Sequence, residues 1–286
     1  FIGVPIAFSL GFITLLGLSG GSIPMQVIVQ RMFTGVDNFA LIAIPLFILA
    51  GNLMAVGGIS KRITAFSESL VGHWPGGLGM VTIVASMIFA AVTGSAIAAT
   101  AAIGGLLIGV MVSKGYSREY TASLVACAGS IGPIIPPSIP LVVYGVMVST
   151  SIAKLFMGGI VPGIIMGISL MIVNYIVSKR RGYVGREVRS TRAELWAGLK
   201  DAILALLMPF IIIGGIVFGI FTPTESAGIA VAYSLLIGAL VYRELTWRNV
   251  VDAFIDAAVM NGIILTVLMT ASLFILFMTV KMIPQQ

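Results

Sequence analysis

Charged side chains are scarce in this chain of 286 residues, at 9% of the composition, against about 25% in an ordinary soluble domain. Long runs carry no charge at all, from Ser69 to Ser113, from Tyr120 to Ala153 and from Leu155 to Ser178. Each run exceeds the ~20 residues that a helix needs to cross a bilayer. The pattern excludes a soluble globular core and predicts an all-α polytopic membrane protein.

Cysteine and histidine are almost absent. The single cysteine, Cys127, excludes an internal disulfide. The single histidine, His73, has no acidic partner beside it, so we expect no enzyme activity and no cofactor. The chain starts at Phe1 inside an apolar run, without an identifiable targeting segment, and is expected to be a fragment.

The net charge of +6 comes largely from one basic loop. Its seven cationic residues are Lys179, Arg180, Arg181, Arg186, Arg189, Arg192 and Lys200. The positive-inside rule places such a loop in the cytoplasm. The basic charge is therefore explained by topology, and no nucleic-acid partner is expected.

Hydropathy predicts six membrane spans, at Phe1–Ser19, Phe39–Val56, Phe156–Ser178, Ala202–Phe221, Ser226–Tyr242 and Val259–Val280. Amphipathic patterns that begin at Ile59 and at Trp247 predict helices at the cytoplasmic interface. Counting spans outward from the basic loop gives a consistent topology only if Gly76–Val112 enters and leaves the membrane on one side.

Two pairs of similar segments suggest an internal repeat. Ile6–Ile13, "IAFSLGFI", resembles Val231–Gly238, "VAYSLLIG", and Pro45–Met54, "PLFILAGNLM", resembles Ser272–Lys281, "SLFILFMTVK". Both offsets are about 225 positions, and the predicted topology reverses the direction of the second copies. An inverted repeat is typical of secondary transporters, although chance similarity between apolar helices is the alternative. Roughly 140 further residues of the second copy are expected beyond Gln286.

Gly76–Val112 is too long for one span, because a single helix would measure about 55 Å against a ~30 Å core. Its centre reads "AAVTGSAIAATAAIGG", with Thr93, Gly94 and Ser95 in the middle. Small residues allow close helix packing, and glycine allows a sharp turn. We predict a helical hairpin that enters from the cytoplasm, with its tip at Thr93–Ala96. A plain helix contact through small residues is the alternative.

The stretch "GSIGPIIPPSIP" places Pro133, Pro136, Pro137 and Pro140 inside an uncharged segment. Proline removes a backbone donor and leaves carbonyls without helical partners, and such backbone is tolerated in a membrane only where it is buried or lines a cavity. We predict an unwound break between helices Thr121–Ser130 and Ser138–Met147. The alternative is a passive proline kink. Neither this segment nor the hairpin contains Asp, Glu, Lys or Arg, which favours Na⁺ held by neutral oxygens over a proton relay.

Three stretches resemble the large membrane subunit of tripartite ATP-independent periplasmic (TRAP) transporters. They are "AVTGSAIAATAAIGG", "KGYSREYTASLVACAGSIGPIIPPSIPLVVYG" and "FTPTESAGIAVAYSLLIGALVYREL", and the resemblance covers essentially the whole chain. It implies an inverted-repeat, elevator-type importer of organic anions such as C4-dicarboxylates or sialic acids, driven by Na⁺ in the bacterial or archaeal cytoplasmic (inner) membrane. It also implies a small membrane subunit and a periplasmic substrate-binding protein as partners.

The resemblance also implies the site. It assigns a Na⁺ position between the hairpin tip and the broken helix, formed by Thr93, Gly94, Ser95, Gly132, Ile135 and Pro137. Substrate contacts are expected at Ser95, Ala96 and Ser138. The second hairpin, the second broken helix and their Na⁺ site have no counterpart in this sequence.

The resulting prediction has four parts: scaffold helices and an interfacial arm at 1–75, the hairpin and broken helix at 76–150, a connecting span with the basic loop at 151–200, and the start of the second repeat at 201–286. Two other functions remain open. A stand-alone ion-coupled carboxylate carrier would need no small partner, and an ion channel would use the broken helix as a filter.

Overall fold

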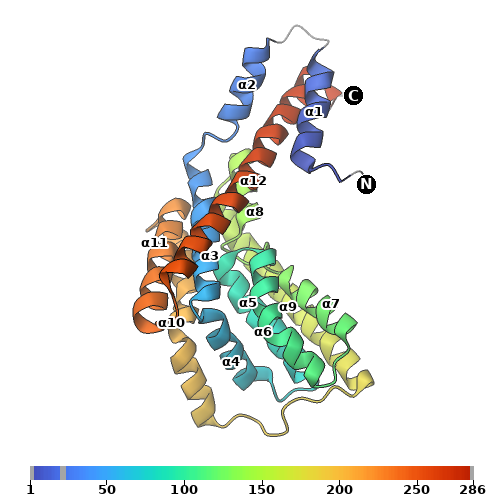
Figure 1. Cartoon of the computed structure of the whole chain (residues 1–286), viewed down its shortest axis with the longest axis vertical. Coiled ribbons are helices and arrows are strands. Elements are labelled where there is room, and N and C mark those ends of the chain that lie inside the picture. The colour runs from blue at the N-terminus through green and yellow to red at the C-terminus, as the bar shows by residue number, and fades with distance from the viewer. Residues whose placement is uncertain (1–2, 20–23, 284–286) are drawn as a thin grey trace.

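The computed structural model describes residues 3–19 and 24–283. The described residues are almost entirely helical (Figure 1). The elements are α1 (Ile6–Ser19), α2 (Met25–Thr34), the 3-10 turn η1 (Phe39–Ile42), α3 (Ala43–Val56), α4 (Ile59–Val71), α5 (Gly77–Thr93), α6 (Ala96–Ser113), α7 (Arg118–Gly129), α8 (Ile139–Met147), α9 (Ile152–Arg181), α10 (Arg192–Val217), α11 (Pro223–Leu236), the π-helical turn η2 (Ile237–Val241) and α12 (Trp247–Val280).

Six of the described helical segments are long and apolar enough to cross a membrane. They are Phe39–Val56, Ala96–Ser113, Ile152–Arg181, Arg192–Val217, Pro223–Val241 and Trp247–Val280. An all-α polytopic membrane protein is thereby confirmed. The first predicted span is not among the six, because its described part is the 14-residue helix α1, shorter than the ~20 residues a span needs.

One predicted boundary is wrong. The sequence patterns divide an interfacial helix from a span at Val259, but α12 runs without interruption over 34 residues. No glycine or proline occurs from Trp247 to Asn261 to end the helix near that point, and apolar residues continue on both sides of it. The predicted amphipathic helix at Ile59 is present as α4, and its apolar face is buried against α5 and α10.

The helices of the repeat run in opposite directions (Figure 1). With the basic loop at the bottom, α1 and α12 rise while α3 and α11 descend. Helices α1 and α3 form the first copy and correspond to α11 and α12 of the second. Each copy packs on the other, because α1 packs on α12 and α11 packs on α3. Exchanged partners are expected when two copies are related by a twofold axis in the membrane plane, so the inverted repeat is supported.

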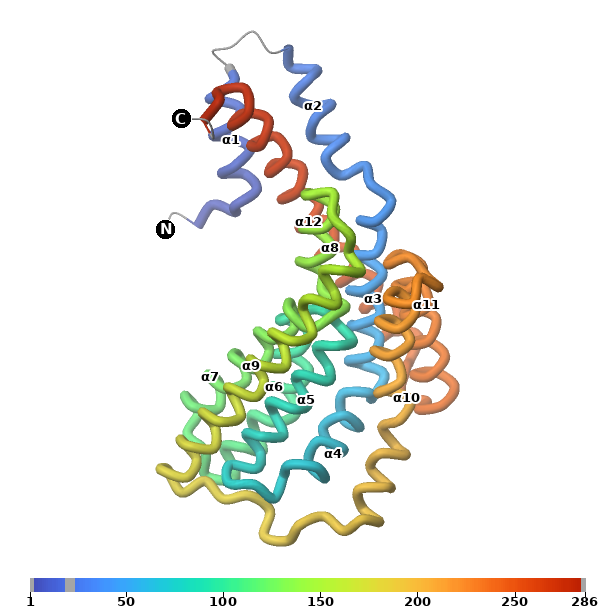
Figure 2. Tube along the Cα trace, turned by 180° about the vertical axis from the view of Figure 1, so that it is seen from behind, coloured from blue at the N-terminus to red at the C-terminus, as the bar shows by residue number. Residues whose placement is uncertain are grey.

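The hairpin and the broken helix form a second group of helices beside this scaffold (Figure 2). Helices α5 and α6 lie side by side and pack on α7, while α9 packs on α5 and α8. Helix α5 starts and α6 ends on the side of the basic loop. The predicted re-entrant hairpin is therefore present, with its tip pointing away from that loop.

Candidate functional site

The hairpin tip consists of three residues with three different backbone roles. Helix α5 ends at Thr93, Gly94 is left-handed with φ of 60°, and Ser95 is extended. The Ser95 hydroxyl accepts a hydrogen bond from the Ala98 amide at 3.3 Å and so caps α6. The left-handed conformation requires glycine at position 94, and the cap directs the chain back towards the basic loop.

The break is unwound over nearly the predicted residues. Helix α7 ends at Gly129, and Ser138 caps α8 by accepting from the Leu141 amide at 3.3 Å. The Ser138 hydroxyl also donates to the Pro133 carbonyl. Among the described residues, the carbonyls at positions 134–137 accept no hydrogen bond. The break therefore offers backbone oxygens that a continuous helix would have paired.

The tip and the break are in direct backbone contact. A Cβ atom on Gly132 would lie 2.9 Å from the Ser95 carbonyl oxygen and 2.9 Å from the Ala96 amide nitrogen. A Cβ atom on Gly94 would collide with the Pro137 carbonyl oxygen. Both glycines are therefore required by space, and the Pro137 carbonyl is aimed at the tip. This contact joins two segments that lie about 40 positions apart in the sequence.

Two of the six predicted ion-site residues direct their side chains elsewhere. The Ile135 side chain lies against Gly163 of α9, and the Thr93 side chain lies against Gly51 of α3. The Thr93 hydroxyl donates to the Phe89 carbonyl at 3.2 Å within its own helix. At these two positions only the backbone is available to an ion at the contact.

A cavity of about 750 Å³ opens beside the tip. One wall is the hairpin, from Thr93 to Ala102, and the opposite wall is made by α3 and α12. Of the three predicted substrate contacts, Ser95 and Ala96 line this cavity. Ser138 is fully buried and its hydroxyl is engaged, while the neighbouring Ile139 and Pro140 line the cavity instead.

Sequence reasoning missed the polar groups of the scaffold wall. Asn52 on α3 lines the cavity and donates to the Ala253 carbonyl of α12 at 3.4 Å. Asn249, Asp252 and Asp256 of α12 line it as well. The available signal was the spacing of the two aspartates, four positions apart, which places them on one helix face.

A buried polar node at the base of the hairpin was also missed. Asn174 of α9 is fully buried, accepts a hydrogen bond from the Tyr120 hydroxyl at 2.8 Å and donates to the Gly76 carbonyl at 3.2 Å. The node joins α9, α7 and the residue before α5. It fixes the end of the hairpin nearest the basic loop to the broken helix, while the glycine contacts join the two at the tip.

The nature of the residues at the tip limits what the site can bind. No group of three His, Cys, Asp or Glu side chains that could hold a metal ion occurs in the part of the chain that the structure describes. The contact instead presents carbonyl oxygens, one hydroxyl and the amino ends of two helices, α6 and α8. Such groups suit a hard monovalent cation and an anion rather than a transition metal.

A membrane protein with an inverted repeat, a re-entrant hairpin and an interrupted helix belongs structurally to the secondary transporters. Residues 1–286 match the family described as "Tripartite ATP-independent periplasmic transporter, DctM component". The chain belongs to this family, and it is accordingly a multi-pass protein of the inner membrane rather than an enzyme.

Curated relatives agree with this assignment. The chain is 44% identical over 285 residues to the isethionate TRAP transporter permease protein DctMQ of Oleidesulfovibrio alaskensis, covering 99% of this chain and 45% of the relative. It is 42% identical over 275 residues to the sialic acid TRAP transporter permease protein SiaT of Haemophilus influenzae, covering 96% and 44%. It is 40% identical over 286 residues to the large permease protein SiaM of Vibrio cholerae, covering 100% and 67%. The chain thus spans less than half the length of the first two relatives.

Proposed function

We propose that this chain moves an organic anion together with Na⁺ across the inner membrane, at the contact between the hairpin tip and the helix break. The observation that carries the proposal is the pairing of Gly94 with the Pro137 carbonyl and of Gly132 with Ser95. This pairing brings unpaired backbone oxygens of the break to a hydroxyl-bearing turn.

The coupling ion follows from the type of these ligands. Carbonyl and hydroxyl oxygens are hard neutral donors, and half-helix ends of this kind coordinate Na⁺ in transporters built from inverted repeats. A proton relay would instead use ionisable groups inside the membrane. No charged residue occurs in the hairpin or the break, between Ser69 and Ser113 or between Tyr120 and Ala153, and the two aspartates of the cavity, Asp252 and Asp256, lie on the scaffold helix α12. Na⁺ is therefore the ion that the site favours.

The substrate class rests on the cavity and on the relatives. A volume of about 750 Å³ lies within the range of ordinary small-molecule pockets. The amino ends of α6 and α8 carry partial positive charge that attracts an anion. Relatives are named for isethionate, sialic acid and C4-dicarboxylate, and all three are organic acids. An organic anion is thus the substrate class for this chain.

The partners and the motion are part of the same proposal. The family name describes a tripartite periplasmic system, which supports a small membrane subunit and a periplasmic binding protein as partners. The hairpin, the broken helix and α9 are joined by the Asn174 node and by the tip contacts. We infer that these helices move together against the scaffold, in an elevator-type cycle.

The test is Na⁺-driven uptake by proteoliposomes that contain the full-length permease with its small subunit and binding protein. Ser95→Ala should raise the Na⁺ concentration for half-maximal uptake several-fold, because an ion ligand and a helix cap are lost together. Ser113→Ala is the matched control, since its hydroxyl is exposed and bonds within its own helix. An unchanged Na⁺ dependence of Ser95→Ala would remove Ser95 from the site.

The two rival functions give different results in the same assay. A stand-alone carrier would accumulate substrate without the small subunit and the binding protein. A channel would carry Na⁺ current without substrate and would not concentrate substrate. The proposed function requires Na⁺, substrate and both partners at once.

A further inference from the structure

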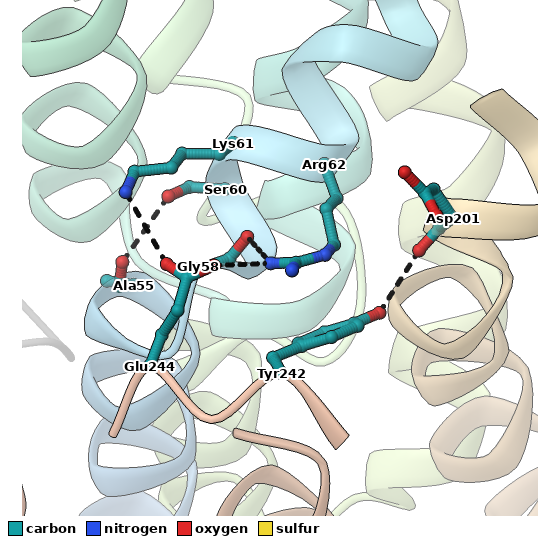
Figure 3. Close-up of polar contacts among 8 residues, drawn as sticks. All are labelled: Ala55, Gly58, Ser60, Lys61, Arg62, Asp201, Tyr242 and Glu244. Carbon is teal, nitrogen blue, oxygen red and sulfur yellow. Dashed lines mark hydrogen bonds and ion pairs between the residues drawn. The ribbon is translucent and has the colours of Figure 1, made fainter. Parts of the chain in front are cut away.

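A polar cluster joins α4, which follows α3 of the first repeat, to the turn that precedes α12 of the second repeat (Figure 3). The Arg62 guanidinium on α4 lies 2.8 Å from a Glu244 carboxylate oxygen and 3.7 Å from the centre of the Tyr242 ring. Lys61 lies 3.4 Å from the other Glu244 oxygen. The Tyr242 hydroxyl donates to the Asp201 carbonyl of α10 at 3.3 Å. One carboxylate is thus held by two cations, and one aromatic ring connects three helical elements.

The backbone on both sides is bent in ways that bring these groups together. Gly58, just before α4, has φ of 79°, and a Cβ atom there would collide with the Glu244 carboxylate. Arg62 also donates to the Gly58 carbonyl at 2.9 Å. On the other side, Arg243 has φ of 54° and directly precedes Glu244, after the π-helical turn η2. Left-handed non-glycine residues and π-turns are costly and are maintained where the surrounding structure requires them.

The cluster lies at the end of the cavity wall. Helix α3 lines the cavity with Asn52 and Val56 and ends at Val56, shortly before Arg62. Helix α12 begins at Trp247, shortly after Glu244, and its first turns line the cavity with Asn249 and Asp252. An ion pair between Arg62 and Glu244 therefore ties the end of one wall helix to the start of the other.

Exposure separates the contributions of the two cations. The side chains of Arg62 and Glu244 retain 25% and 31% of their exposure, whereas Lys61 retains 67%. Exposed ion pairs contribute little, while a planar guanidinium that stacks on an aromatic ring is more strongly held. Arg62 is therefore the effective partner of Glu244, and Lys61 serves as an internal control.

We propose that Arg62, Glu244 and Tyr242 are positioning residues that fix the ends of α3 and α12 to each other, so that the scaffold wall of the cavity stays rigid while the hairpin and the broken helix move against it. The inference rests on the proposed function for its transport readout. It does not require any of the three residues to touch substrate.

The first experiment is a charge exchange. Proteoliposomes with the full-length permease and its partners are assayed with whichever of radiolabelled sialic acid, succinate and isethionate the wild type accumulates. Arg62→Glu and Glu244→Arg should each lower the maximal uptake rate at least tenfold, and the double exchange, which restores the ion pair but not the stacking on Tyr242, should recover part of that loss. Lys61→Gln should stay within twofold. Single variants near the wild-type rate, or a double exchange no better than the singles, would overturn the proposal.

The second experiment does not depend on transport and decides the case if the charge reversals fail to insert. Glu244→Gln keeps the shape of the side chain and removes its charge. Amide hydrogen exchange in the purified full-length protein should accelerate at least fivefold at residues 58–62 and 242–246, while the hairpin stays unchanged. Equal exchange in the wild type and the variant would overturn the proposal. A wild type that accumulates no substrate would reject the proposed function alone, because the exchange result stands by itself.

Discussion

Proline has opposite effects in the long helices α9 and α10 and in the segment between α7 and α8. Helices α9 and α10 contain Pro162 and Pro209 in their interiors and still run over 30 and 26 residues. Between the end of α7 at Gly129 and the start of α8 at Ile139, where three prolines occur, the chain forms no helix. A single proline in a membrane helix is thus tolerated, whereas the clustered prolines leave several carbonyls that need other surroundings.

Those surroundings come from the hairpin. Gly132 touches the Ser95 and Ala96 backbone, and Gly94 touches the Pro137 carbonyl, so each interruption fits into the other. Helices α9 and α10 have no such partner and stay continuous. The comparison indicates that the unwound conformation of the break depends on its contact with the hairpin tip as much as on its own prolines.

The largest effect is expected when this fit is destroyed. Gly132→Ala should lower the rate of Na⁺-driven uptake at least a hundredfold, because its Cβ atom would lie 2.8–2.9 Å from the Ser95 and Ala96 backbone. Gly94→Ala should act similarly. Uptake by proteoliposomes at equal protein amounts is the measurement.

Two control variants separate collision from backbone strain. A Cβ atom on Gly105 meets nothing within 4 Å, and the same holds for Gly115, which also has φ of 88°. Gly105→Ala should leave uptake unchanged. Gly115→Ala should lower the folding stability by only the ~1 kcal/mol that a left-handed alanine costs. If Gly132→Ala behaves like Gly105→Ala, the tip and the break do not need to touch.

The next effect concerns the prolines themselves. Replacing Pro136 and Pro137 together by Ala removes about 3 kcal/mol of helix penalty per residue, which favours a continuous helix and pairs the carbonyls that face the tip. Uptake should fall at least tenfold with normal membrane insertion. Pro162→Ala in α9 is the matched control and should retain wild-type uptake. If the double variant keeps the wild-type Na⁺ dependence of uptake, the prolines form only a passive kink and do not shape the ion site.

A smaller effect is expected at the base of the hairpin. Asn174→Leu leaves the Tyr120 hydroxyl without its acceptor, at about 1–3 kcal/mol for an unsatisfied buried group, and removes one of the two donors to the Gly76 carbonyl, which keeps the Met80 amide. The midpoint of thermal unfolding in detergent should fall by several degrees. Ser169→Ala, which removes an exposed hydroxyl on the same helix, should leave the midpoint unchanged. Equal midpoints for both variants would show that the node does not hold the hairpin.

The smallest effect concerns pH. The hydrogen bond from Arg62 and the charge of Lys61 hold the pKa of Glu244 below its usual value of 4.5. The stabilisation is therefore present above 4.5 and is lost only as the pH falls through the lower, folded-state pKa. The ratio of wild-type to Glu244→Gln uptake should stay constant between about pH 6 and 8. A ratio that changes in this window would mean that another group titrates at the cluster.

Features that depend on local chemistry could be predicted from the sequence. The hairpin tip follows from Gly94 between small residues, and the break follows from four prolines near Gly129 and Gly132. Both appear within a few residues of their predicted positions. Backbone rules act over a few residues, so sequence alone reveals them.

Features that depend on neighbours distant in sequence could not be predicted. Asn174 reads as an ordinary residue of a span until Tyr120 and Gly76 are placed beside it. Arg62 and Glu244 pair across about 180 positions. The aspartates of α12 line the cavity only because α12 is continuous and packs on α3. Such contacts are set by the packing of whole helices.

The neutrality of the hairpin and the break has an electrical consequence. Moving one elementary charge through a potential of 100 mV changes the free energy by about 2.3 kcal/mol. No formal charge lies between Gly77 and Val112 or between Tyr120 and Ala153. These two segments would carry no charge of their own through the field, and membrane voltage would act there on the net charge of the bound Na⁺ and substrate. The resting potential would therefore favour import only when the Na⁺ ions carried outnumber the negative charges of the substrate.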